Sequence, residues 1–159
     1  MAQDVLDETD RGILYLLQQN ARETTAAEIA EAVGVSAGTV RNRIDRLEEQ
    51  GVLEGYIPDI DYETAGFELH ILFTCTSETQ PTTEFVEEVL DQHGVVTVRK
   101  LLAGDQNLHV EAVGTSTGDI SQIAKTLQEC GLDISRSEVL EAEFRQPFNH
   151  FGQKLADKK

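Results

Sequence analysis

The sequence predicts an α+β fold, with a three-helix unit of about fifty residues ahead of a unit that mixes strands and helices. Two observations predict it. Apolar residues recur at helical spacing up to about residue 50, and runs that alternate between apolar and polar begin after Gly66. The later runs follow in the order strand, helix, strand, strand, helix, strand. This order is typical of the ferredoxin-like βαββαβ plait, a four-stranded antiparallel sheet with both helices on one face.

The first predicted helix opens with the acidic segment 6–10, which suits the helix dipole, and ends at residues 20–22. Its apolar stripe consists of Ile13, Leu14 and Leu17. A second, shorter helix is predicted after Thr25, because Thr25 and Glu28 have the spacing of a capping box. Residues 34–36 then form a tight break that begins with glycine. A short helix, a three-residue turn and a longer helix are the layout of a helix-turn-helix.

The third predicted helix begins after Ser36, which can cap its first free amides. Gly51 is placed to end this helix in the left-handed region. Its buried stripe has the spacing i, i+4, i+7 and consists of Val40, Ile44 and Leu47. At about 100° per residue, the positions expected opposite this stripe are Gly38, Asn42 and Arg46, with Thr39 and Asp45 beside them and Arg41 and Arg43 on the flanks.

These outward positions hold residue types that read DNA, since arginine can pair bidentately with guanine edges or with phosphates. An ordinary solvated helix with scattered arginines is the alternative, and the preceding short helix and turn favour the DNA-binding interpretation. We therefore expect this helix to enter the major groove of double-stranded DNA. The residues expected to contact DNA are Ser36, Gly38, Thr39, Arg41, Asn42, Arg43 and Arg46.

The charge balance is unusual for a DNA-binding protein. The chain of 159 residues has 29 Asp and Glu against 13 Lys and Arg, for a net charge of -16. Phosphate neutralisation normally calls for a basic surface. Disorder does not explain the acidity, because 40% of the residues are hydrophobic. We interpret it as a halophilic adaptation to molar salt, where the Debye length is only about 3 Å. The alternative, an acidic protein that avoids nucleic acid, conflicts with the local cluster of arginines.

Cysteine usage and hydropathy indicate a cytoplasmic protein. Cys75 and Cys130 lie in apolar runs without metal-type spacing, so we expect two reduced, buried thiols. No run approaches 18 apolar residues and no secretory segment opens the chain, so a membrane partner is not expected.

The domain organisation follows from where the periodicity changes. Residues 1–58 form the predicted (winged) helix-turn-helix domain, 59–65 a connector, 66–146 the plait and 147–159 a C-terminal tail. Within the plait we expect strands at 67–75, 95–103, 107–113 and 133–145, with one helix between Pro81 and Gly94 and a second between Gly118 and Gly131.

Nearly the whole chain resembles the Lrp/AsnC family of feast/famine regulators. The resemblance is carried by LDETDRGILYLLQQNAR, by AEIAEAVGVSAGTVRNRIDRLEEQGVLEGY and by the plait after them. It implies a sequence-specific transcription regulator, with an N-terminal DNA-reading domain and a C-terminal domain that forms dimers through facing sheets. It also implies that such dimers often assemble into octamers and respond to small effectors, usually amino acids. No enzymatic activity and no cofactor are implied.

The resemblance further implies an effector site near the turn between the second and third strands of the plait. The corresponding residues here are Gly104, Asp105 and Asn107, and Asn107 stands where the family usually has Asp. An amino-acid ammonium prefers a full negative charge, which leaves Asp105 as the candidate partner. A plain hairpin turn is the alternative, because Gly-Asp is ordinary turn chemistry.

Three other functions are alternatives to transcription regulation. His70 and His109 would lie on adjacent central strands, on the face away from the helices, and are weak candidates for a Zn²⁺ or Cu²⁺ site. A polar, dimer-facing sheet is the favoured interpretation, so no metal is expected. Some tetrapyrrole decarboxylases have a similar two-domain architecture, so fold alone does not exclude an enzyme. The plait here shows no His-Arg-Tyr set that could serve such catalysis. A small-molecule- or metal-responsive module that has lost DNA binding is a third alternative, which the arginines disfavour.

Overall fold

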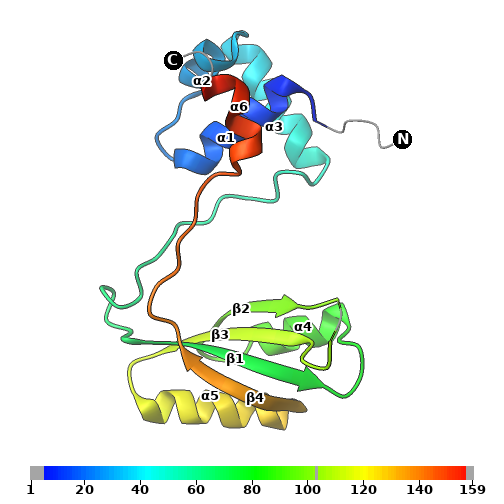
Figure 1. The fold of residues 1–159 in the computed structure, drawn as a ribbon, viewed down its shortest axis with the longest axis vertical. Coiled ribbons are helices and arrows are strands. Elements are labelled where there is room, and N and C mark those ends of the chain that lie inside the picture. The colour runs from blue at the N-terminus through cyan, green and yellow to red at the C-terminus, as the bar shows by residue number, and fades with distance from the viewer. Residues whose placement is uncertain (1–5, 103, 157–159) are drawn as a thin grey trace. The chain divides into compact units, whose positions relative to one another are not determined.

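The structure, a computed structural model, describes residues 6–102 and 104–156 (Figure 1). The chain divides into two compact units. One contains the described residues up to Pro58 together with those from Phe144 onward, and the other runs from Asp59 to Glu143.

The first unit is built on three helices, α1 (Glu8–Asn20), α2 (Ala26–Val33) and α3 (Ala37–Glu49). Each contributes apolar side chains to one small core, whose fully or almost fully buried members are Ile13, Leu17, Ile29, Ala30 and Val40. Residues 52–68 contain no strand, so the segment that follows the helix-turn-helix pairs with no other strand in the described part of the chain.

Local capping explains where these helices begin and end. The Thr25 side chain accepts from the Glu28 amide while the Glu28 carboxylate accepts from the Thr25 amide, so the predicted capping box is confirmed. Ser36 caps α3 by accepting from the Thr39 amide at 3.1 Å, also as predicted. Gly51 adopts a φ of 68°, the left-handed conformation expected after the third helix.

The second unit is the predicted ferredoxin-like plait. Its elements are β1 (Leu69–Ser77), α4 (Thr83–Leu90), β2 (Val95–Lys100), β3 (Leu108–Gly114), α5 (Thr117–Glu129) and β4 (Leu132–Val139). The strands pair antiparallel in the order β2-β3-β1-β4. One sheet face and both helices share a core that is buried completely or nearly so and includes Phe73, Val89, Val110, Ile123 and Leu127. The α+β fold class is therefore confirmed.

The other sheet face is the one opposite α4 and α5 (Figure 1). We call it the open face. The alternation of β1 and β3 assigns to it the residues between the core positions, and cross-strand register pairs them as His70 with Val113, Leu72 with Glu111 and Thr74 with His109. Polar and apolar side chains thus mix on this face.

Two predicted strands are too long. β4 ends at Val139, whereas the predicted strand extends to residue 145. Its partner β1 begins at Leu69, and a single further bond joins the Leu140 amide to the His70 carbonyl, so later residues have no strand to pair with. Phe144 is accordingly 93% exposed. β2 ends at Lys100, and position 103, the predicted end, lies outside the described residues.

The C-terminal segment forms a helix, α6 (Asn149–Ala156), where the sequence predicts only a tail. It packs on α1: a Cβ added at Gly152 would lie 2.6 Å from the ring of Tyr15, and Lys154 forms an ion pair with Glu8. The Phe148 amide also donates to the Gln18 side chain at 3.2 Å. The structural units therefore differ from the predicted domains, since residues from Phe144 onward join the helical unit instead of forming a separate tail.

The two cysteines differ in their surroundings. Both are free thiols, and Cys75 is completely buried in the plait core, where burial raises its pKa to about 11. Cys130 is only partly buried, so the prediction of two buried thiols holds for Cys75 alone. In the part of the chain that the structure describes, no helix is both long enough and apolar enough to cross a membrane.

Candidate nucleic-acid interface

The N-terminal half of α3 presents a polar surface to solvent. Ser36, Gly38, Arg41 and Asn42 are exposed, and Thr39 is half-buried. The hydroxyls of Ser36 and Thr39 lie 2.9 Å apart and share a hydrogen bond, which fixes both side chains at the start of the helix. Five of the seven residues expected to contact DNA thus gather around the first two turns of α3.

The start of α3 is also favourable for an anion. The first turns of α1, α2, α4 and α5 each contain an acidic residue, whereas that of α3 contains none. A helix N-terminus carries a partial positive charge and unpaired amides, both of which attract phosphate. In a chain with 29 acidic residues, this is a place where a DNA backbone can approach without meeting a carboxylate on the same turn.

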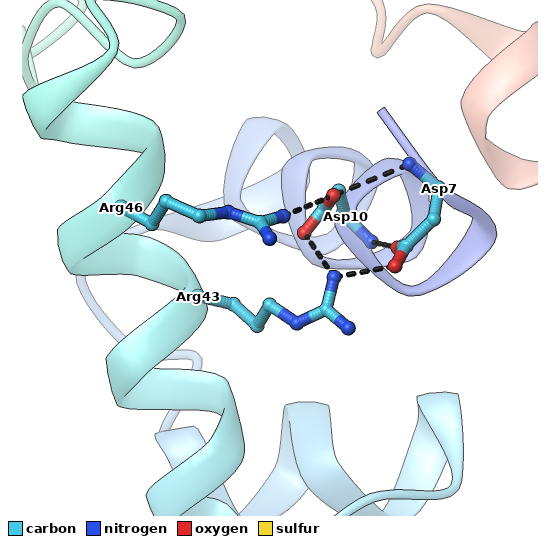
Figure 2. Close-up of polar contacts among 4 residues, drawn as sticks. All are labelled: Asp7, Asp10, Arg43 and Arg46. Atoms are coloured by element: carbon cyan, nitrogen blue, oxygen red, sulfur yellow. Dashed lines mark hydrogen bonds and ion pairs between the residues drawn. The ribbon is translucent and has the colours of Figure 1, made fainter. Parts of the chain in front are cut away.

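Arg43 and Arg46 lie elsewhere, turned towards the N-terminus of α1 (Figure 2). The Arg43 guanidinium donates to Asp7 at 2.5 Å and to Asp10 at 3.1 Å, and Arg46 donates to the second oxygen of Asp10 at 2.6 Å. We call these four side chains the Asp–Arg quartet. Arg46 lies three residues from Arg43, on the same flank of α3, and its ion pair with Asp10 turns its side chain towards α1 instead of towards the outward face expected from the sequence.

Asp10 is the centre of the quartet. Its side chain is only 1% exposed, while those of Arg43 and Arg46 are 27% and 43% exposed. The Asp7 amide also donates to Asp10, and the Asp10 amide donates to Asp7, so the pair doubles as the cap of α1. Asp10 is not among the site residues predicted from the sequence, although it lies three, four and seven residues before Ile13, Leu14 and Leu17, within the buried stripe.

The ionisation of the quartet follows from these contacts. Partial burial alone would raise the pKa of Asp7, but hydrogen bonds from the Asp10 amide and the Arg43 guanidinium outweigh it and lower that pKa. The pKa of Arg43 is raised, chiefly because its guanidinium donates to the Asp7 carboxylate and also to Asp10. Two carboxylates thus face two guanidiniums, and their formal charges cancel.

The predicted effector residues fall into two groups. Gly104, with a φ of 105°, and Asp105 are exposed in the turn between β2 and β3. Asn107 is buried, and its side-chain amide both accepts from the Ser77 amide at 2.8 Å and donates to the Ser77 carbonyl at 3.1 Å. The expectation that Asn107 faces a ligand is therefore wrong, because both polar atoms of its side chain already hold the end of β1.

The two candidate metal ligands do not come together. His109 pairs in register with Thr74, four residues along β1 from His70, a separation of about 13 Å along the strand. His70 instead faces Glu111 at 3.5 Å and the ring of Tyr62 edge-on, while Glu111 forms an ion pair with Arg99. Across residues 6–102 and 104–156 there is no group of three side chains that could hold a metal ion.

A capped recognition helix in a three-helix unit, joined to a separate plait, defines a helix-turn-helix DNA-binding protein. Residues 6–54 match the family described as winged helix-turn-helix DNA-binding. The chain is 38% identical over 103 residues to the HTH-type transcriptional regulator LrpA of Pyrococcus horikoshii, which covers 64% of this chain and 70% of LrpA.

Solved structures agree. The crystal structure of MtbAldR superposes with a TM-score of 0.73 at 26% identity, over 88% of this chain and 97% of that one. A transcriptional regulator from Neisseria meningitidis in complex with L-Met has the same fold, with a TM-score of 0.73 at 24% identity, over 90% of this chain and 94% of that one. The chain belongs to the Lrp/AsnC family and is a DNA-binding transcription regulator.

Proposed function

We propose that the chain reads DNA sequence with the N-terminal half of α3, through Ser36, Gly38, Thr39, Arg41 and Asn42. The observation that carries this proposal is the exposure of Arg41 and Asn42, side by side, next to a capped helix start without acidic residues. An arginine can bond bidentately to guanine and an asparagine to adenine in the major groove. The two hydroxyls and the amides near Gly38 are suited to phosphate contacts, which set the register.

Replacing Asn42 with alanine is expected to weaken binding to the preferred site by about 1–3 kcal/mol and to relax base preference at one position. Fluorescence anisotropy with a duplex selected from random sequences measures the affinity. Gln19→Ala, an exposed amide on α1, is the matched control and should bind like the unaltered protein. Equal affinity for the Asn42→Ala and control variants would mean that α3 does not lie in the groove.

We also propose that the protein acts as a homodimer through the open face of the plait, with an octamer as a higher assembly. The support is a sheet face that carries the partly exposed Leu72 and lies opposite both helices of its unit. Such a face is normally buried by another layer. We further propose a regulator rather than an enzyme, because the relatives named above are transcriptional regulators.

For the effector we propose an amino acid bound at the turn formed by Gly104 and Asp105. Two observations support it. Asp105 is an exposed carboxylate that can pair with an ammonium group, and Gly104 lets a ligand approach the backbone closely. The Neisseria meningitidis regulator of the same fold was solved with L-Met bound.

Asp105→Ala is expected to abolish the response to amino acids. Thermal melts in the presence of each of the twenty common L-amino acids should reveal at least one that raises the melting temperature. A ligand at about 100 times its dissociation constant adds about 2.7 kcal/mol of stability. Glu87→Ala, which removes an exposed carboxylate from α4, should keep the response. If the amino acid raises the melting temperature of the Asp105→Ala and Glu87→Ala variants equally, the effector does not bind at Asp105.

A further inference from the structure

The three arginines of α3 have the same chemistry but different surroundings. Arg43 and Arg46 lie on one flank and are held by Asp7 and Asp10 (Figure 2). Arg41 is exposed, and among the described residues its side chain has no ion pair. Two residues of helix separate Arg41 from Arg43, a rotation of about 200°, so the two project to different sides.

The quartet resists opening because Asp10 is buried. A carboxylate that is only 1% exposed cannot regain full hydration if its arginines leave, and an unpaired buried charge is strongly unfavourable. The N-terminus of α1 adds its partial positive charge to the stabilisation of both carboxylates. Salt screens buried pairs much less than exposed ones, so the contacts to Asp10 should persist in concentrated KCl.

We infer that Asp7 and Asp10 withhold Arg43 and Arg46 from DNA, so that Arg41 is the side-chain cation that α3 offers to the duplex. Asp10 is then a positioning residue, which acts on DNA binding through the arginines that it holds. This inference rests on the proposed function of α3.

The inference predicts how DNA affinity depends on salt. Each phosphate neutralised by a cation adds about 0.9 to the slope of log affinity against log salt concentration, because condensed cations are released. One contact more or less corresponds to about an eightfold change in the ratio of affinities at 0.1 and 1 M KCl. If the Asp–Arg quartet served only to stabilise the fold, substitutions in it would change the melting temperature without changing this slope.

The test compares four variants of the full chain on a short duplex of arbitrary sequence across a range of KCl. We expect Arg41→Gln to make the slope of log affinity against log salt concentration shallower by about 0.9. We expect Arg46→Gln to leave this slope unchanged. Asp10→Asn should release Arg46, since Asp7 still holds Arg43, and should steepen the slope by about 0.9. The double variant Asp10→Asn/Arg46→Gln should return to the original slope, which controls for indirect effects of Asp10.

Circular dichroism at each salt concentration identifies the range in which every variant is folded, and slopes are compared there. If Arg46→Gln flattens the slope as much as Arg41→Gln does, or if Asp10→Asn leaves it unchanged, the inference is overturned while α3 remains the DNA-reading helix. If Arg41→Gln and Asn42→Ala both bind like the unaltered protein, the proposed function itself fails.

Discussion

Leu72→Asp is expected to convert the protein to a monomer and to weaken its binding to a two-half-site operator by about a hundredfold or more. Leu72 lies on the open face and pairs in register with Glu111 of β3 and Glu138 of β4. A third carboxylate between these two would be buried against the partner sheet beside like charges. The protomer itself should lose little stability, because Leu72 is only partly buried within one chain.

The monomer should bind the operator more weakly because it has one recognition helix, whereas the dimer has two. Two linked recognition helices bind with an effective local concentration, and avidity can exceed the affinity of one module by about 10²–10⁴. Light scattering measures the assembly and anisotropy measures the affinity. Leu90→Asp makes the same change at an exposed leucine of α4, on the helix-covered side of the plait, and should stay dimeric. A dimeric Leu72→Asp variant, or an unaltered protein that is monomeric, would contradict the proposed interface.

The melting temperature is expected to rise steadily from dilute buffer to molar KCl, and DNA binding is expected to persist there. The net charge is -16, and residues 1–58 alone contain five Arg against eleven Asp and Glu. The Debye length is about 30 Å at 0.01 M and about 3 Å at 1 M, so these carboxylates repel one another and the phosphates unless salt screens them. Two of the five arginines are already neutralised in the quartet.

The contrast with an ordinary DNA-binding protein is large. A protein that makes 6–10 phosphate contacts loses about 10³–10⁵ in affinity between 50 and 200 mM salt. Here an acidic surface must take up cations as it approaches DNA, which opposes their release, so the slope should be shallow or positive. Glu31→Gln/Glu49→Gln removes two exposed charges and should reduce the salt dependence of melting. If the melting temperature does not depend on KCl and the affinity for DNA falls steeply as KCl increases, the acidic composition is not an adaptation to salt.

The parts of the site that depend on neighbours in sequence were predictable. The Thr25–Glu28 box and the Ser36 cap each join residues three apart, and Gly51 ends α3 by its own backbone conformation. The alternation along β1 likewise follows from side chains that point to opposite faces at every step. Such features are fixed by chain geometry over a few residues, so they can be recognised before any packing is known.

The orientation of the arginines needed the tertiary structure. Helical periodicity gives the angle of Arg46 around α3 but not which partner stands on that flank, and the partner Asp10 is 36 residues away in sequence. Asn107 is similar, because its side-chain amide is bonded to the backbone of Ser77, 30 residues earlier, and so is not available in the turn proposed to bind the effector.

The C-terminal helix α6 also could not be predicted from the sequence alone. It has only eight residues, and isolated helices shorter than about 12–15 residues are marginal in water. The packing of Gly152 on Tyr15 and the ion pair of Lys154 with Glu8 stabilise it. The capped helices and the sheet alternation could therefore be predicted from the sequence, because they rest on local periodicity, and the family could be predicted from the resemblance of its motifs. Which charges face solvent could be read from the tertiary structure alone, since burial and pairing depend on residues that folding brings together.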